Sequence, residues 1–255
     1  MTYVEVGGRP TWHEVHGAGR PVVLLHGAFA GVSSWAGQAP VLAEAGYRVH
    51  VPERRGHAHT PDVPGPLTYG AMADDTVAYL DEVVGGPAHL VGWSDGAVVG
   101  LLVVQRRPDL VDRLVLIGQY HNSSGKVPGG LVDQLKEGGG QLMGFLRDEY
   151  DRVSPDGSEH FPVVFAKTLR MLTTEPELDL GSLTAVEAPT LVLQGDRDEV
   201  TLEHSVAVAA ALPQGRLAVI HALPVENPEV VNALLLWFLA GAAPAADWSA
   251  SKPGR

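Results

Sequence analysis

The sequence predicts an α/β fold in which a mostly parallel sheet of eight strands is flanked by helices. Along the 255 residues, short β-branched segments alternate with longer helical ones, which is the pattern of a parallel sheet covered on both faces. Between residues 121 and 188 this alternation stops, because helical stretches follow one another with no strand between them. A chain of this length can bury one large core and carry an inserted subdomain. We therefore expect one domain with a helical insertion.

The expected strands are short and are separated by turns rich in glycine, proline and charged residues. They cover residues 4–6, 11–16, 22–25, 47–51, 88–91, 114–117, 191–193 and 217–220. Apolar residues at helical spacing predict the covering helices. These cover residues 32–45, 69–84, 97–104 with an extension to about 107, 202–212 and 230–239.

These elements divide the chain into a core and an insertion. Residues 1–120 and 189–240 form the expected core, and residues 121–188 form the insertion. Residues 241–255 are rich in alanine, proline and serine. We expect them to be a disordered tail, since chain ends without apolar anchors are usually poorly ordered.

Composition and charge exclude several classes of function. The chain has 30 acidic and 18 basic residues, a net charge of -12, whereas nucleic-acid binding needs clustered Lys and Arg. It has no cysteine, so neither disulfides nor thiolate chemistry contribute. The N-terminal residues lack the pattern of a signal peptide, and the apolar run at residues 233–240 is too short to cross a bilayer. We expect a cytoplasmic monomer or homodimer that binds a small molecule and neither nucleic acid nor a membrane.

The most informative motif is Gly-Trp-Ser-Asp-Gly at residues 92–96. A short apolar segment leads into it and an apolar helical segment follows, so the motif predicts a strand, a sharp turn and a buried helix. In such a turn the serine adopts a strained backbone conformation, and the flanking glycines let strand and helix pack closely. Ser94 is therefore the candidate nucleophile. The pentapeptide alone is weak evidence, and its context and companions carry the prediction.

The companions of this motif are a His-Gly turn before it, an acid after a later strand and a histidine near the end of the chain. With them the chain resembles the α/β-hydrolase fold superfamily, and the Trp-Ser-Asp core is similar to that of the valacyclovirase-like, or biphenyl-hydrolase-like, serine hydrolases. The resemblance spans roughly residues 3–240. It implies an α/β-hydrolase fold, a helical cap at residues 121–188 that closes over the nucleophile, and no cofactor.

The resemblance also implies a catalytic base and its acid. His221 lies five residues before Glu226, which begins a Glu-x-Pro sequence, and this is similar to the catalytic histidine of the family. Family members place the acid three residues after the glycine that ends the preceding strand, which selects Asp198, with Asp196 as the second choice. In this arrangement Asp198 holds the imidazole tautomer that takes the proton of Ser94.

The oxyanion that forms on attack needs backbone donors. The resemblance implies the amide of Asp95 and that of Ala28 or Phe29, in the turn after His26. The side chain of Asp95 has two interpretations: receipt of a substrate ammonium, as implied for valacyclovirase-like enzymes, or stabilisation at a helix N-terminus. We expect Asp95, Phe29 and His121 to contact substrate, and we interpret His26 as a residue that orients its loop.

One feature departs from the family pattern. His221 directly follows Ile220, so the loop before it is shorter by about four residues than in the resembling enzymes. If the strand runs through Ile220, His221 lies at the strand tip and is poorly placed to reach Ser94, and errors of about 1 Å already cost large factors in rate. His121 is the best substitute base, although no acid accompanies it in sequence and a role in the cap hinge is the alternative.

The segment at residues 57–62 contains two histidines and an aspartate, which are possible zinc ligands. No second cluster accompanies it, and the family has a similar turn without metal, so we expect no metal. The sequence therefore predicts a serine hydrolase of small carboxylic esters or lactones. The alternative is a ligand-binding protein, cyclase or isomerase of the same fold with a displaced histidine.

Overall fold

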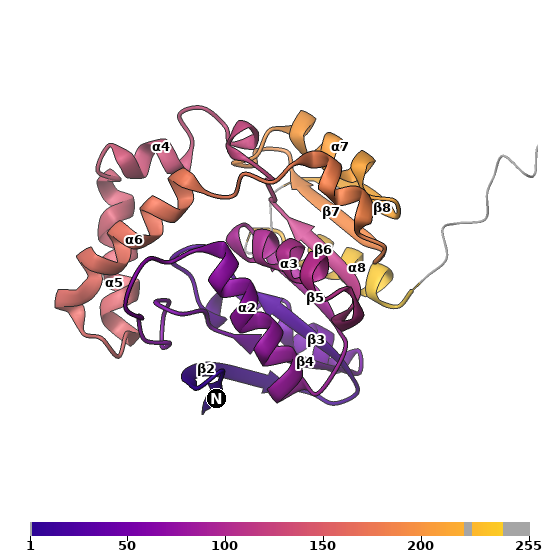
Figure 1. Ribbon diagram of the computed structural model, residues 1–255, viewed down its shortest axis with the longest axis horizontal. Helices are drawn as coiled ribbons and strands as arrows, with labels where there is room; N and C mark the ends of the chain where they lie inside the picture. The colour runs from indigo at the N-terminus through magenta and orange to yellow at the C-terminus, as the bar shows by residue number, and fades with distance from the viewer. Residues whose placement is uncertain (1, 222–225, 242–255) are drawn as a thin grey trace, which may run out of the picture.

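A single eight-stranded sheet forms the centre of the protein (Figure 1). The computed structural model describes residues 2–221 and 226–241. In sheet order the strands are β1 (Thr2–Val6), β2 (Arg9–His16), β4 (Tyr47–Pro52), β3 (Arg20–Leu25), β5 (Ala88–Trp93), β6 (Val111–Ile117), β7 (Thr190–Gly195) and β8 (Gly215–Ile220). β2 pairs antiparallel with β1 and β4, and all other neighbours are parallel. The predicted eight-stranded, mostly parallel sheet is confirmed.

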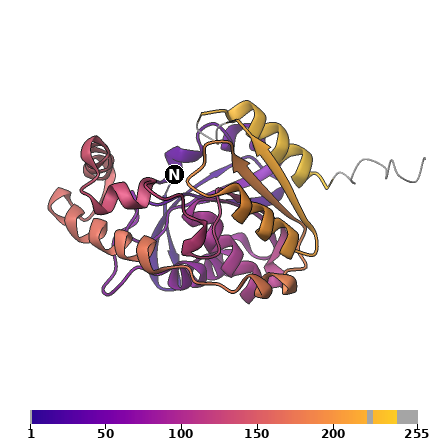
Figure 2. The same cartoon turned by 90° about the horizontal axis from the view of Figure 1, so that it is seen from above.

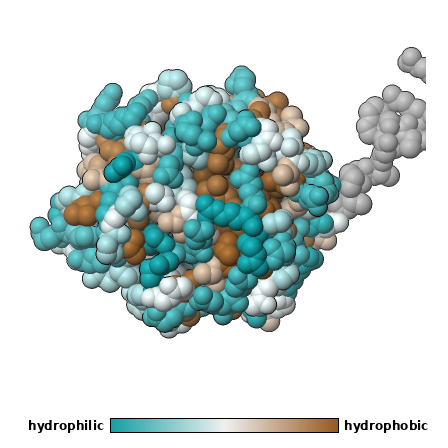
Figure 3. All heavy atoms as spheres, viewed as in Figure 1, coloured by the Kyte–Doolittle hydropathy of each residue, from teal (hydrophilic) through white to brown (hydrophobic). Residues whose placement is uncertain are grey.

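Alternation along the strands builds a core on each face of the sheet. In β3, Val23 and Leu25 belong to one buried cluster and Val22 and Leu24 to the other, because successive side chains point to opposite faces. The first cluster is covered by α2 (Tyr69–Tyr79), α3 (Asp95–Arg106) and α7 (Leu202–Ala211), and the second by α1 (Ala39–Glu44) and α8 (Pro228–Leu239). On the face seen in Figure 3, hydrophilic residues cover most of the surface and hydrophobic ones show in small patches.

Two expected helices differ from the structure. The helix predicted over residues 32–45 is a 3-10 turn, η1 (Val32–Trp35), followed by the short helix α1. Gly37 lies between the two, and a proline in the first turn of α1 favours a helix start there. The helix predicted over residues 69–84 ends as α-helix at Tyr79, and its last turn is a π-helix, η2 (Leu80–Val84).

Three helices separate β6 from β7. They are α4 (Leu131–Lys136), α5 (Gly140–Val153) and α6 (Phe161–Thr174), and they project from one side of the core in both views (Figures 1 and 2). Tyr150, Phe161 and Val164 form a small buried cluster within this insertion. That the insertion at residues 121–188 is a separate cap stays a prediction. Of the expected tail, only Gly241 is among the described residues.

Candidate active site

Ser94 lies in the sharp turn between β5 and α3. Its backbone has φ 53° and ψ -118°, a left-handed conformation that is rare for a residue with a side chain. A Cβ atom on Gly96 would lie 2.0 Å from the carbonyl oxygen of Leu25, and one on Gly92 would lie 2.3 Å from the oxygen of Gly96. Glycine is therefore required at both positions, because strand and helix approach closely on either side of the serine.

A cavity of about 580 Å³ opens in front of Ser94. Its walls come from the loops at the carboxyl ends of β3, β5, β6 and β7 and from the insertion. The lining residues are Gly27, Ala28, Trp93, Ser94, Gly118, Tyr120, Lys126, Val127, Leu131, Val132, Phe145, Leu172, Arg197, Asp198, Glu199 and Glu226. The cavity thus brings together three of the predicted site residues, Ser94, Ala28 and Asp198, and none of its described lining residues is a histidine.

The turn after β3 lies against Ser94. A Cβ atom on Gly27 would lie 3.5 Å from the Cβ of Ser94. Within the described part of the chain, the amides of Ala28, Phe29 and Asp95 make no hydrogen bond, so they are available as donors. We note that a helix N-terminus leaves its first amides unpaired in this way. These amides have the free donor capacity that an oxyanion site needs.

Hydrogen bonds from Arg54 hold the loop that carries Gly27. The guanidinium of this buried side chain donates to the carbonyl of His26 and, over 3.0 Å, to that of Gly27. The His26 ring accepts a hydrogen bond of 3.1 Å from the Arg54 amide, and burial holds its pKa well below the ordinary value. His26 is therefore neutral and fully buried, as expected for a residue that orients its loop.

Asp198 lines the cavity from the loop after β7. Its Oδ2 accepts a hydrogen bond of 3.0 Å from the Gly195 amide, and its Oδ1 lies close to Gly118 on the loop after β6. Burial raises the pKa of this carboxyl, against the hydrogen bonds from backbone amides that lower it. Asp198 is thus an acid held by backbone donors on the wall that it shares with Ser94.

His221 lies at the tip of β8, directly after the last strand residue, Ile220. Its Nδ1 is 2.9 Å from Oδ2 of Asp196, and 78% of its side chain is exposed. Among the described residues it makes no hydrogen bond to Ser94 or Asp198. The histidine therefore contacts the second-choice acid, in keeping with the short loop that precedes it.

Asp95 is not among the residues that line the cavity. It is fully buried beneath the turn, where its Oδ1 accepts a hydrogen bond of 2.7 Å from Tyr69. The Tyr69 hydroxyl is also 2.9 Å from that of Tyr120, which does line the cavity. Burial raises the pKa of Asp95. Asp95 therefore faces the cavity only through neighbouring tyrosines, and its expected direct contact with substrate stays a prediction.

Phe29 and His121 also lie outside the cavity lining. Phe29 has φ 56°, and its ring stacks on Phe165 of the insertion with centroids 5.6 Å apart. The His121 ring stacks on His204 at 4.3 Å, and its Nδ1 is 2.8 Å from the Leu178 carbonyl. Both side chains are engaged in packing between the insertion and the core. Their expected contact with substrate, and the role of His121 as a substitute base, stay predictions.

Tyr120 and Lys126 are among the polar residues of the cavity that were not anticipated. The Lys126 ammonium lies 4.7 Å from the centre of the Tyr120 ring, and it donates hydrogen bonds to the carbonyls of Leu172 and Glu175. Both residues follow β6 within ten positions, where the insertion begins. The signal that could have found them is this position at the carboxyl end of a central strand.

The histidines and the aspartate of the segment at residues 57–62 bind different partners and do not converge on one point. The His57 ring bonds the Arg55 carbonyl, the His59 ring contacts Glu53, and Asp62 binds Lys167. Over residues 2–221 and 226–241, no group of three or more His, Asp or Glu side chains is arranged to hold a metal ion. Over the same residues, no helix is long and apolar enough to cross a membrane.

Comparison with known proteins places this geometry in a family. A model of the alpha/beta hydrolase fold matches residues 20–136. The putative carbamate hydrolase RutD of Agrobacterium fabrum is 27% identical over 89% of this chain and 97% of its own. The chain belongs to the α/β-hydrolase fold superfamily. As an α/β-hydrolase it shares its fold with the esterase EaEST from Exiguobacterium antarcticum, with a TM-score of 0.77 and 21% identity over 94% of this chain and 99% of that one.

A second esterase, the thermophilic enzyme from Thermogutta terrifontis, is 26% identical to this α/β-hydrolase with a TM-score of 0.70, over 94% of this chain and 99% of that one. The predicted superfamily, fold and hydrolase class are therefore confirmed. The closer resemblance to valacyclovirase-like enzymes and the expected monomer or homodimer stay predictions.

Proposed function

We propose that this α/β-hydrolase is a serine hydrolase that cleaves a small carboxylic ester or lactone. The observation that carries the proposal is Ser94 itself, which is held in a left-handed turn between β5 and α3 and lines a cavity together with Asp198. A strained turn of this kind presents the serine hydroxyl above the strand ends, where substrates of α/β enzymes bind.

In the proposed reaction, Ser94 Oγ attacks the ester carbonyl while His221 takes its proton. The amides of Asp95 and of Ala28 or Phe29 stabilise the oxyanion. The C–O bond then breaks, the alcohol leaves with the proton from His221, and an acyl-serine remains. Water, deprotonated by His221, attacks this acyl group. The bond from the acyl carbon to Ser94 Oγ then breaks, His221 returns its proton to Oγ, and the acid leaves. Asp198 orients His221 and stabilises its imidazolium form.

This relay requires His221 to exchange Asp196 for Asp198 when substrate is bound. The exchange is supported by the exposure of the His221 side chain, whose one side-chain hydrogen bond among the described residues is the contact with Asp196. A solvent-exposed pair of this kind contributes at most about 1 kcal/mol, so a rotation of the ring away from Asp196 is energetically accessible. Catalytic hydrogen bonds often tighten only in the complex with substrate.

The cavity also supports a small substrate. Its volume of about 580 Å³ lies within the range of small-molecule sites. Leu131, Val132 and Phe145 of the insertion supply apolar wall. An acyl or alcohol group of a few carbons can be buried there, with the carbonyl directed to the serine.

The test is turnover of p-nitrophenyl butyrate together with labelling by an active-site-directed fluorophosphonate. Ser94→Ala should abolish both, with kcat lowered by a factor on the order of 10⁴ or more. The matched control is Ser158→Ala, at an exposed serine of the insertion, which should react as the wild type does. Undiminished hydrolysis by Ser94→Ala would refute the proposal. Undiminished hydrolysis by His221→Ala would refute only the assigned base.

A further inference from the structure

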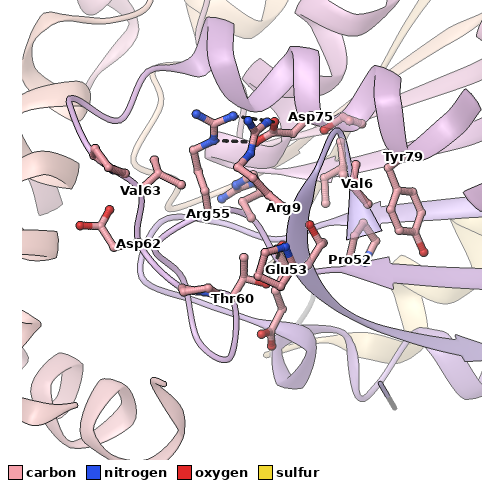
Figure 4. A pocket seen from close by; sticks show the side chains of 17 residues that line it. Val6, Arg9, Pro52, Glu53, Arg55, Thr60, Asp62, Val63, Asp75 and Tyr79 are labelled. Carbon is pink, nitrogen blue, oxygen red and sulfur yellow. Dashed lines mark hydrogen bonds and ion pairs between the residues drawn. The ribbon is translucent and has the colours of Figure 1, made fainter. Parts of the chain in front are cut away.

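A second cavity, of about 350 Å³, lies on the other side of the β3 end. It is enclosed by β1 and β2, by the segment at residues 52–64 and by α2 (Figure 4). It shares no lining residue with the Ser94 cavity. The proposed hydrolysis makes no use of it, so its chemistry has to be explained separately.

One part of this cavity is apolar. Val6 and Leu25, both fully or almost fully buried, lie on its wall, and Pro10, Pro52 and Val63 complete that wall. Ligand sites in proteins are mostly apolar concavities that carry a few convergent polar groups. This wall suits a hydrocarbon ring or a short chain.

The polar part of the cavity is an arginine pair that shares one carboxylate. Arg9 from β2 and Arg55 from the segment after β4 both donate to Asp75 of α2. Figure 4 shows both guanidinium groups beside Asp75. Two guanidinium groups against one carboxylate leave an excess of one positive charge. Each guanidinium carries five N–H donors, more than Asp75 can accept.

The other charged groups of the lining are engaged elsewhere. Glu53 accepts hydrogen bonds from the amides of Val32 and His59, and the charge of Asp62 is offset by Lys167. Arg54 donates to the carbonyls of His26 and Gly27, and its buried Nε has no partner in the described part of the chain. The groups of the lining that can still donate hydrogen bonds to a ligand are therefore N–H groups of Arg9, Arg54 and Arg55.

We propose that this cavity is a binding site for a small apolar carboxylate. The carboxylate would accept hydrogen bonds from Arg9 and Arg55, whose planar groups match carboxylate geometry, and the hydrocarbon would lie against Val6 and Leu25. Such a ligand would contact the segment from which Arg54 holds the Gly27 loop. The site does not depend on the proposed hydrolysis.

The binding test uses benzoate and its neutral counterpart benzyl alcohol, measured by titration calorimetry on the Ser94→Ala protein. Benzoate should bind at least about tenfold more tightly than benzyl alcohol, because charged hydrogen bonds are lost with the carboxylate. Arg9→Gln should weaken benzoate binding by at least about tenfold. Arg20→Gln is the matched control, since Arg20 pairs with Asp112 and does not line the cavity. The Arg9 side chain is 42% exposed, so this variant should fold, and circular dichroism checks that it does.

The location is tested by photolabelling with 4-azidobenzoate and mass mapping of the labelled peptides. Label within residues 52–64 or 75–79, displaced by benzoate, supports the proposal. Label confined to residues 118–132 or 197–199 would place the acid in the Ser94 cavity and overturn it. The proposal would also be overturned if benzoate did not bind, or if the Arg9→Gln and wild-type proteins bound it equally.

Discussion

The ends of β5 and β8 hold the two residues proposed to exchange a proton, and they differ in how they are built. β5 is a central strand with neighbours on both sides, and its residues up to Gly92 are buried. β8 is an edge strand, in which Leu217 and Val219 are 36% and 48% exposed. Ser94 is therefore held by close backbone packing, whereas the described side-chain contact of His221, with Asp196, is exposed.

This difference indicates how the site can be both precise and adaptable. The turn at Ser94 is closely confined, because a Cβ atom on Gly92 would overlap the backbone of α3 and one on Gly96 would overlap the backbone at the end of β3. The His221 side chain, in contrast, is 78% exposed. The nucleophile is therefore preorganised, and the base is the part of the proposed relay that moves.

The largest expected effect separates the two candidate acids. Asp198→Asn should lower kcat by a factor on the order of 10⁴, because an amide favours the wrong tautomer of the base. Asp196→Asn should change kcat by less than about tenfold, since an exposed pair contributes little. Steady-state kinetics on p-nitrophenyl butyrate measures both. A large loss for Asp196→Asn with a small one for Asp198→Asn would instead assign the acid to the contact seen at the tip of β8.

The fold could be predicted from the sequence because apolar runs mark where the strands begin and end. Apolar runs locate β5, β6 and β7, and their parallel arrangement brings the loops after them to one edge of the sheet, where Ser94, Asp198 and the predicted donor Ala28 line one cavity. The interruption near Gly37 was not readable from apolar spacing alone, since the same residues suit a continuous helix.

The direction of individual side chains was less predictable. Phe29 has φ 56°, and its ring stacks on Phe165 of the insertion. The Asp95 side chain accepts a hydrogen bond from Tyr69. His121 stacks on His204, a residue 83 positions later in the chain. Each outcome depends on a partner that is distant in sequence, and neither periodicity nor a local motif contains that information.

The next prediction tests how rigid the β5 end is. Gly96→Ala should lower the free energy of unfolding by about 3 kcal/mol, because the added Cβ would meet the backbone oxygens of Leu25 and His26 at 2.0 and 2.7 Å. The control is Gly144→Ala in α5, where a Cβ meets nothing within 4 Å and alanine should stabilise by about 0.5–1 kcal/mol. Urea denaturation measures both. Equal urea midpoints for Gly96→Ala and the wild type would show that the turn is not constrained as described.

A third prediction concerns pH and the buried start of β5. Burial lowers the pKa of His89 to about 4, and both ring nitrogens lack partners in the described part of the chain. The unfolded chain takes up the proton near pH 6.5, whereas the folded state resists it. The stability associated with the neutral ring is therefore fully present above pH 6.5 and is lost as the pH falls toward 4, at up to about 1.4 kcal/mol per pH unit.

His89→Leu removes this contribution without stranding a hydrogen-bond partner. The variant should lose less stability than the wild type between pH 7 and pH 5, by about 1–2 kcal/mol. Urea midpoints measured across this range give the difference, and the range from pH 7 to 8.5 serves as the internal control. Parallel curves down to pH 5 would mean that the ring is protonated, or reaches water, within the folded sheet.

The smallest expected effect compares the starts of two helices, α2 and α7. Thr68 caps α2, where its side chain accepts a hydrogen bond of 3.1 Å from the Ala71 amide. The next residue, Tyr69, donates a hydrogen bond to Asp95, the residue after Ser94. Thr201 begins α7 beside β8 and makes no such bond. Thr68→Ala should therefore cost about 1 kcal/mol of unfolding free energy, and Thr201→Ala a few tenths at most. Thermal denaturation of both variants decides the point. Equal losses would mean that α2 supports the turn at Ser94 no better than α7 supports the end of β8. The difference between the two strand ends would then lie in the strand packing alone.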